Sequence, residues 1–258
     1  MALKLANIST TERLRQGKSA IPSILELRTM DVFFRDYDFE GDLFPGGTAP
    51  GIFQSTASGT AAAAAAISTG VVNGAILLDA GSDNGGRSDL SLGLHLRGDR
   101  YAHCWWRAQI SAVTSVKAEW GLTDVVSGTD AGAVNVKATP TWTATDAVVL
   151  CVDTNDGTEL SLMGVKAGTA ETVVDVSTTK LTLAAATDYY FGIELRDDQA
   201  RAHILDANGR LIISTEWMDD AVTETVLLTP WAFVQNRSGS QRTMTIDYLA
   251  IYQRRTAS

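Results

Sequence analysis

The carboxyl-terminal part of the chain alternates between apolar and polar residues around a strong turn signal. Residues 189–196 repeat with a period of two, which is the period of a half-buried strand. Two further apolar runs, 200–205 and 211–213, flank Asn208-Gly209. Asn-Gly between apolar runs favours a two-residue β-hairpin, because both central residues of a type I′ turn need φ > 0. A long β-branched and aromatic run at 243–252 completes a pattern that predicts the closing strands of a β-sandwich.

Turn residues also divide the central part of the chain into short apolar runs. Residues 90–96 alternate cleanly, and Gly98-Asp99 suits a type II′ hairpin from which 101–116 would return as one long strand. Residues 61–66 fit a short helix and a small-residue strand equally well. Further strands are predicted at 134–138, 147–152, 159–165 and 171–176. Turn signals every 8 to 12 residues indicate a sandwich rather than alternating strands and helices.

Charge divides the chain into two parts. Residues 1–30 contain five basic and two acidic residues, a net charge of +3, whereas the whole chain carries −9, so that residues 31–258 carry −12. An acidic body argues against sequence-independent binding of nucleic acid, which requires neutralised phosphates. No uninterrupted apolar stretch is long enough to span a membrane, and no secretory signal is visible. We therefore expect a soluble protein made in a cytoplasm, with neither a nucleic acid nor a membrane as partner.

The first thirty residues are predicted to form an arm that precedes a single β-sandwich domain at 31–258. Ser9 and Glu12 fit a capping box, and Gly17 would end the resulting helix after about two turns. Such a short helix is unstable alone, so the arm is expected to dock, either on its own domain or on a neighbouring subunit. Its basic side chains are the candidate docking contacts: Arg13, Arg15 and Lys18.

The order of these runs resembles concanavalin A-like lectin/glucanase sandwiches, and in particular structural proteins of tailed bacteriophages. The resemblance covers roughly residues 42–252. It is carried by segments 106–111, 118–124, 144–148, 191–195, 206–209, 228–232 and 242–248. It implies an all-β, concanavalin A-like jelly-roll sandwich with an N-terminal arm, and it carries no functional residues across.

The resemblance implies a non-enzymatic virion structural protein, made in the host cytoplasm. We predict a capsid decoration or head-surface protein, anchored by its arm to the major capsid protein or another virion protein. A homo-oligomer, such as a trimer, is expected from this class of protein. The alternative is a lectin-like carbohydrate-binding module of a tail or head fibre that recognises a cell-surface glycan.

Catalytic, metal and cofactor sites are not predicted. Glucanases of this fold place their carboxylates on one strand as Glu-x-Asp-x-Glu, and that motif is absent. Glu119 and Glu194 are each a single strand carboxylate without a partner. The acidic loop at 153–159 fails the calcium-loop spacing. Its Asp and Asn residues, with Asp83-Asn84, are of the kind that could contribute to a lectin-like calcium site.

Two tryptophans are the candidates for surface recognition. Trp105 and Trp106 are adjacent on a predicted strand, so one must face inward and the other outward. The outward ring could stack on a sugar, and packing in the core is the simpler alternative for either. The Gly98-Asp99 hairpin would place His103 diagonally from His95, too few ligands for zinc. Two buried thiols are favoured over one disulfide for the only cysteines, Cys104 and Cys151.

Overall fold

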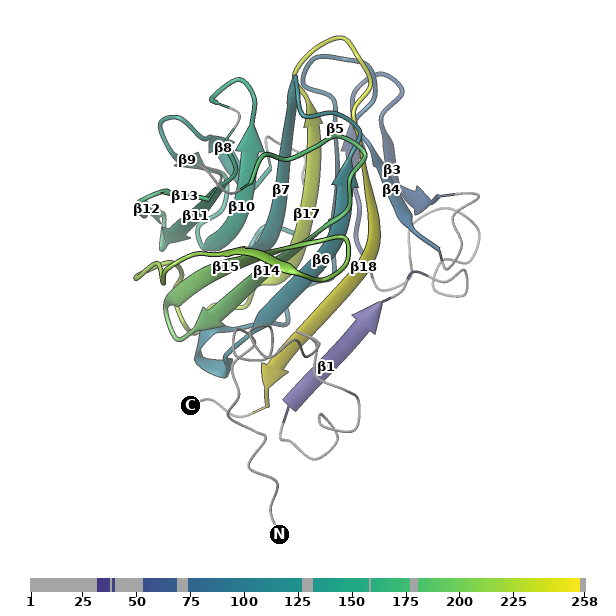
Figure 1. Cartoon of the computed structure of the whole chain (residues 1–258). Helices are drawn as coiled ribbons and strands as arrows, with labels where there is room; N and C mark the ends of the chain where they lie inside the picture. Colours follow the sequence, from purple (N-terminus) through teal and green to yellow (C-terminus); the bar gives the residue numbers. More distant parts are fainter. Residues whose placement is uncertain are drawn as a thin grey trace.

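Two large antiparallel sheets packed face to face form the body of the protein (Figure 1). The computed structural model describes residues 32–37, 39, 53–68, 74–126, 132–157, 159–176 and 181–255. Nearly all of the regular structure in these residues is β-strand, which confirms the predicted all-β sandwich. No helix among them is both long enough and apolar enough to cross a membrane.

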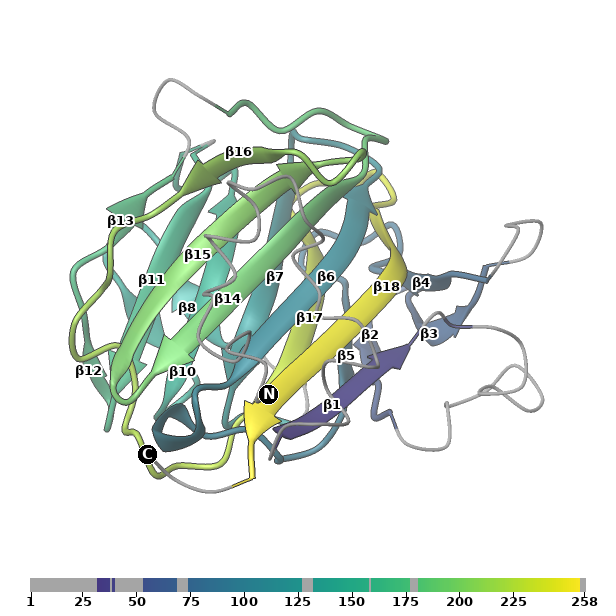
Figure 2. The same cartoon turned by 60° about the horizontal axis from the view of Figure 1, so that its bottom comes forward.

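The first sheet, sheet A, contains the strands with the strongest sequence pattern, and Figure 2 shows it face on. Its order is β16-β15-β14-β6-β18-β4-β3, and β1 also pairs with β18. The strand bounds are β1 Val32–Tyr37, β3 Ala63–Ile67, β4 Ile76–Asp79, β6 His103–Ile110, β14 Tyr189–Arg196, β15 Gln199–Asp206, β16 Leu211–Ser214 and β18 Thr243–Arg254.

The second sheet, sheet B, has the order β12-β11-β10-β7-β17-β5-β2, and β13 pairs with β11. Its strand bounds are β2 Ala57–Ser58, β5 Arg87–Ser91, β7 Val116–Thr123, β10 Ala147–Asp153, β11 Ser161–Lys166, β12 Thr169–Ala170, β13 Val174–Asp175 and β17 Thr229–Asn236. A small separate hairpin pairs β8 (Val134–Val136) with β9 (Thr141–Trp142).

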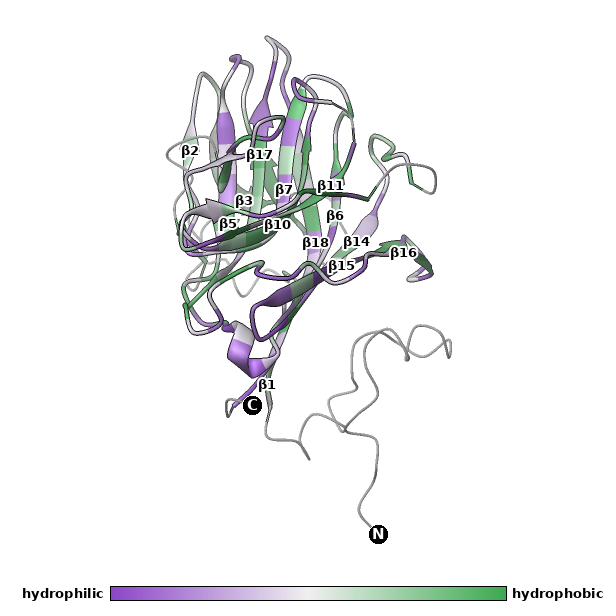
Figure 3. Cartoon of the chain, turned by 90° about the vertical axis from the view of Figure 1, so that its left-hand side faces the viewer, coloured by the Kyte–Doolittle hydropathy of each residue, from purple (hydrophilic) through white to green (hydrophobic). Residues whose placement is uncertain are grey.

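The space between the sheets is filled by the inward-facing side chains of both. Trp106 of sheet A and Trp120 of sheet B are both fully buried there, and Trp120 stacks on Phe191 with ring centroids 4.1 Å apart. In Figure 3 the hydrophobic segments gather in the strands, whereas much of the connecting chain is pale or hydrophilic. This layered arrangement leaves each sheet with a second, outer face.

The outer face of sheet B is covered by the protein's own chain. Ala133 and Val134, next to and within β8, pack with Trp231, Phe233 and other apolar side chains of sheet B. The Glu119 carboxylate, fully buried, accepts hydrogen bonds from the Ala133 and Val134 backbone N–H groups at 2.9 and 3.2 Å. This side of the sandwich is therefore closed.

Two of the predicted turns differ from the structure. Leu96 bridges to Leu228 beside sheet B, and a 3-10 turn at Gly98–Arg100 then carries the chain across to β6 of sheet A, so that the predicted hairpin is wrong. The expected long strand at 101–116 is consequently shorter: β6 ends at Ile110 in sheet A, and Val116 already begins β7 in sheet B. The Asn208-Gly209 hairpin is confirmed, but only Gly209 has positive φ, so the turn is not type I′.

Residues 61–66, for which helix and strand remained equal alternatives, contribute most of β3. The four strands predicted between 134 and 176 are present, with shifted ends. The cysteines are free thiols in different layers, Cys104 between the sheets and Cys151 on the outer face of sheet B, which confirms the prediction of two buried thiols.

Candidate functional site

The outer face of sheet A carries an ordered array of aromatic and charged side chains. Three neighbouring strands, β14, β6 and β18, pair so that their outward positions align in rows. In that strand order the rows are Tyr190–Arg107–Tyr248, Gly192–Trp105–Ala250 and Glu194–His103–Tyr252, followed by Arg196, Tyr101 and Arg254 at the strand ends. We call these four rows the aromatic face. Successive rows are two residues apart, so the face is about 20 Å long.

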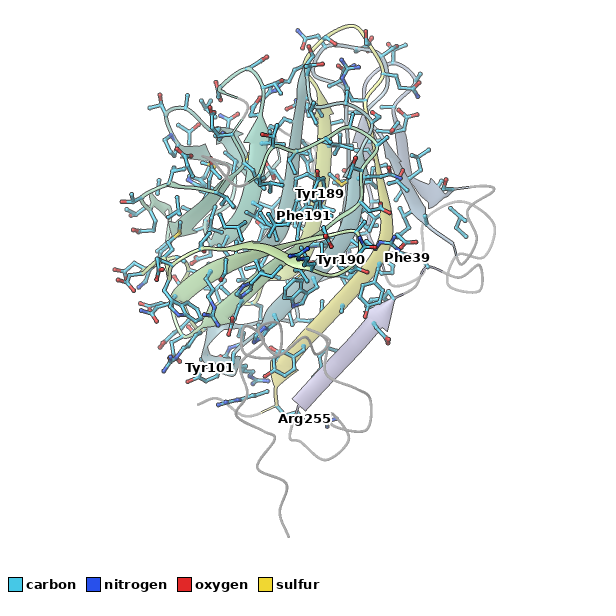
Figure 4. The ribbon with its side chains drawn as sticks, viewed as in Figure 1. Phe39, Tyr101, Tyr189, Tyr190, Phe191 and Arg255 are labelled. Carbon is cyan, nitrogen blue, oxygen red and sulfur yellow. The ribbon has the colours of Figure 1, made fainter. Side chains whose placement is uncertain are left out.

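Figure 4 shows the direction of three side chains in the first part of β14. Tyr189 and Phe191 lie on the side of the strand that faces sheet B, and Tyr190 lies on the other side. Tyr101 lies toward the lower end of the same sheet. Strand alternation therefore separates the core residues from the aromatic face.

An irregularity in β18 completes the first row of this face. Ile246 pairs with Ala108 and Tyr248 pairs with Arg107, which leaves Asp247 as the extra residue of a β-bulge. Bulges re-aim side chains, and here the Asp247 carboxylate pairs with Arg107 on the outer face. Asp188, just before β14, holds the same guanidinium at 3.0 Å.

Arg107 is thus fixed between two carboxylates, with Tyr190 and Tyr248 on either side along the row. The guanidinium carbon lies 5.8 Å from the Tyr190 ring centroid. Although burial opposes it, the negative charge of Asp247 and Asp188 raises the pKa of Arg107 above its ordinary value. The exposed fractions of the Arg107, Asp188 and Asp247 side chains are 30%, 28% and 22%, so all three reach solvent.

The second row is built around a glycine that makes room for Trp105. A methyl group on Gly192 would lie 2.5 to 2.7 Å from three atoms of the Trp105 ring, so the indole lies directly over the glycine backbone. Trp105 also stacks on His203 of β15 with ring centroids 5.7 Å apart and planes 13° apart. Its neighbours on the outer side are Tyr190, Leu205, Tyr248 and Ala250.

The third row is centred on one carboxylate. Glu194 pairs with Arg201, accepts a hydrogen bond from His203 Nε2 at 3.1 Å, and lies 3.9 Å from His103 Nε2. Burial would raise the pKa of Glu194, but His103, His203 and Arg201 outweigh it and lower that pKa to about 2. Burial lowers the pKa of His103 to about 4, against the opposing effect of Glu194. At neutral pH the row therefore holds an anionic Glu194 and a neutral His103.

The structure separates the two tryptophans named from the sequence. Trp106 is fully buried between the sheets, so it has no surface for recognition, whereas Trp105 belongs to the aromatic face with a relative exposure of 5%. The arm residues Arg13, Arg15 and Lys18 lie outside the described residues. Their proposed docking contacts stay a prediction.

The strand carboxylates considered for catalysis cannot act together. Glu119 lies on the outer face of sheet B and Glu194 on the outer face of sheet A, on opposite sides of the sandwich. A glycosidase pair must lie about 5 to 10 Å apart across one bond. Glu119 is also occupied by Lys117, whose Nζ lies 3.1 Å from its carboxylate, and by Trp231 Nε1 at 2.9 Å.

Neither the histidines nor the acidic loops form a recognisable metal site in the described part of the chain. No group of three or more His, Cys, Asp or Glu side chains is arranged there to hold a metal ion. Asp153 instead forms a buried pair with Arg237, and Asp83 accepts a hydrogen bond from the Thr60 N–H. His103 faces Glu194 and Tyr252 rather than His95, because the predicted hairpin does not form.

Comparisons with known proteins identify the fold. No protein-family model and no curated protein matches the chain. A protein of unknown function from Shewanella oneidensis MR-1 aligns with a TM-score of 0.56 and 14% identity over 94% of this chain and 93% of that one. Peanut lectin with a nine-residue peptide aligns with a TM-score of 0.57 and 8% identity over 86% of this chain and 97% of that one. A Bacteroides ovatus GH16 protein in complex with a G4G4G3G product aligns with a TM-score of 0.55 and 9% identity over 84% of this chain and 99% of that one.

At these identities the similarity shows the fold alone, which is the concanavalin A-like lectin/glucanase sandwich. The comparisons do not link the chain to a tailed bacteriophage. That finer part of the sequence resemblance stays a prediction.

Proposed function

We propose that the protein is a non-enzymatic, lectin-like carbohydrate-binding protein that binds a glycan along the aromatic face. The observation that supports this most directly is the first row, where Arg107 is fixed between two carboxylates and flanked by Tyr190 and Tyr248. A sugar ring has an apolar C–H face and a rim of hydroxyl groups. Aromatic rings stack on the former, and fixed planar charged groups form hydrogen bonds with the latter.

The asymmetry of the sandwich favours the same face. The outer face of sheet B is filled by β8, β9 and the buried Glu119 network, which leaves little room for a ligand there. On sheet A, the row-forming side chains Tyr190, Tyr248 and Tyr252 are half-buried, and their strands β14 and β18 lie on the two sides of β6. A linear chain of several sugar residues fits the length of the aromatic face.

The charge states of the face favour binding over hydrolysis. A glycosidase needs one carboxyl group protonated at working pH, which requires a raised pKa. Glu194 has a pKa lowered to about 2 and is paired with Arg201. Asp188 and Asp247 are both held in ion pairs with the Arg107 guanidinium.

The test is a glycan screen with the full-length chain, followed by titration calorimetry of each glycan that binds. Arg107→Gln and Tyr190→Ala are expected to weaken binding about tenfold or more, because each removes one recognition element of the first row. Arg210→Gln is the matched control, since Arg210 is an exposed arginine in the β15–β16 hairpin. Trp105 should report binding through its fluorescence. Equal affinity of the wild type and both first-row variants would refute the assignment of this face, and hydrolysis of a bound glycan would refute the non-enzymatic part.

The virion role stays a separate prediction that rests on the sequence resemblance. Its test is co-sedimentation of the protein with capsids that lack it, comparing full length with a chain starting at Asp31. If the full-length chain sediments with the capsids and the shortened chain does not, the result would support an anchoring arm that carries Arg13, Arg15 and Lys18. Failure of both chains to sediment would remove the decoration hypothesis and leave glycan binding untouched.

A further inference from the structure

We infer that the glycan bound by the aromatic face is acidic, and that its carboxylate or sulfate group is held by Arg196 and Arg254 beside Tyr101. This inference rests on the proposed function and specifies the ligand of the same face. The three residues form its fourth row, one row beyond Glu194, His103 and Tyr252.

Both guanidinium groups lie over the same aromatic ring. The guanidinium carbon of Arg254 is 4.1 Å from the Tyr101 ring centroid, and that of Arg196 is 5.9 Å from it. These cation–π contacts position both arginines without using their N–H groups. Those N–H groups therefore remain available for a planar or tetrahedral anion.

The arginines of the fourth row differ from the other two arginines of this face. Arg107 is neutralised by Asp188 and Asp247, and Arg201 by Glu194. Among the described residues, Arg196 and Arg254 form no ion pair with a carboxylate. Arg196 is exposed and Arg254 is half-buried, so this positive charge faces solvent at one end of the aromatic face.

The positive charge of the fourth row contrasts with the negative charge of the whole chain. A chain with a net charge of −9 repels polyanions in general. Preference for an acidic glycan therefore requires a local site. Arg196 and Arg254, which form no ion pair with a carboxylate of the described residues, provide one. The first row, at the other end of the face, would bind a more distant sugar of the same chain through its hydroxyl groups.

Tyr101 is held in an unusual backbone conformation at this position. It has φ 51° and ψ 59° at the end of the 3-10 turn, where its N–H donates to the Gly98 carbonyl at 2.9 Å. The left-handed region is sterically unfavourable for a bulky aromatic residue, and such strain concentrates at functional positions. The strained turn places the ring of Tyr101 between the ends of β14 and β18.

The experiment compares acidic and neutral ligands on the full-length chain. The acidic probes are polygalacturonate, alginate, hyaluronate and chondroitin sulfate, and the neutral probes are mannan, galactan, xyloglucan and mixed-linkage β-glucan. Each acidic binder is retested after its charge is removed, by methyl esterification or desulfation. Sodium sulfate serves as the free-anion probe, and Arg196→Gln, Arg254→Gln and the control Arg210→Gln are titrated in parallel at fixed ionic strength.

The expected result is binding of an acidic glycan at least tenfold tighter than its neutralised form. Arg196→Gln and Arg254→Gln should each weaken that binding about tenfold, Arg210→Gln should not change it, and Tyr101→Phe should retain it. Binding of neutral glycans only, or an acidic preference unchanged in both variants, would overturn the inference while the proposed function stands. If sulfate and the acidic glycan bound with equal affinity, the two arginines would form a site for free anions rather than for a glycan. Absence of binding to all eight polysaccharides would overturn the proposed function and this inference together.

Discussion

At the scale of single residues, the aromatic face depends on the absence of one side chain. The Trp105 indole lies over Gly192, where a methyl group would be 2.5 to 2.7 Å from three ring atoms. We predict that Gly192→Ala displaces the ring, weakens glycan binding, and lowers the free energy of unfolding by about 1 to 3 kcal/mol through overpacking. Near-ultraviolet circular dichroism and denaturant unfolding measure both effects.

Gly239→Ala is the control for this substitution, because a methyl group there would approach its nearest neighbour, the Ser82 carbonyl oxygen, only to 4.0 Å. If Gly192→Ala left both the tryptophan spectrum and the stability unchanged, the position assigned to Trp105 would be wrong.

The third row makes stability dependent on pH. The pKa of His103 is lowered from 6.5 to about 4, mainly by burial, so the unfolded chain takes up its proton at a higher pH than the folded one. This group therefore stabilises the fold above about pH 6.5, and the contribution is lost as the pH falls through about 4. Glu194, with its pKa lowered from 4.5 to about 2, acts in the same direction at lower pH. We expect the unfolding temperature to fall between pH 6.5 and 4, with a shallower fall in His103→Gln.

A pH-independent unfolding temperature across this window would contradict the burial of a neutral His103. His95→Gln serves as the comparison, because His95 lies in the connection between β5 and β6 rather than in the third row.

At the scale of elements, the bulge in β18 decides which side chains reach the aromatic face. Met244 and Ile246 point inward before it, and Leu249 and Ile251 point inward after it. Deleting Asp247 should leave a regular strand in which both pairs still point inward, because the bulge accommodates this one extra residue between the two inward patterns. We predict that the deletion lowers the free energy of unfolding by only about 1 kcal/mol, because no large apolar side chain leaves the core.

Asp247→Ala keeps the bulge and removes only a partly exposed ion pair, so it should cost no more than about 1 kcal/mol. It should nevertheless weaken glycan binding by freeing Arg107. Urea unfolding of both variants measures these effects, and a loss of several kcal/mol in the deletion variant alone would show that β18 cannot keep its register without the extra residue.

The sequence predicts strands well and their connections less well. Alternation located β14 and β15, and the Asn-Gly pair located their neighbour β16, because these elements are determined by local pattern. The Gly98-Asp99 pair was misinterpreted because glycine serves there for close approach to the Asp197 carbonyl rather than for a hairpin. Whether a chain turns back or crosses to the other sheet depends on contacts such as Leu96–Leu228, which are remote in sequence.

The candidate site was only partly predictable for the same reason. Because Trp105 and Trp106 are adjacent on one strand, the sequence places them on opposite faces of the sheet. It does not decide which of the two points outward. The switch in inward positions between Ile246 and Leu249 was a visible signal for the bulge, and it was overlooked. No local pattern could pair Arg107 with Asp188 and Asp247, which are 81 and 140 residues away.

At the scale of the whole molecule, the two outer faces of the sandwich have different roles, and Glu119 separates them. On sheet B the fully buried Glu119 carboxylate binds Lys117, Trp231 and two backbone N–H groups of the β8 segment. Removing one partner of a buried ion pair costs about 3 to 5 kcal/mol, so Glu119→Ala should strongly destabilise the protein. Replacing both partners in Lys117→Met/Glu119→Leu removes the unpaired charge but leaves three buried N–H donors without their acceptor, so it should recover only part of that loss. Because sheet A lies on the other side of the core, glycan affinity measured well below the unfolding temperature should not change in the double variant. A double variant that folds but no longer binds glycan would move the binding site to sheet B, the face that its own chain covers.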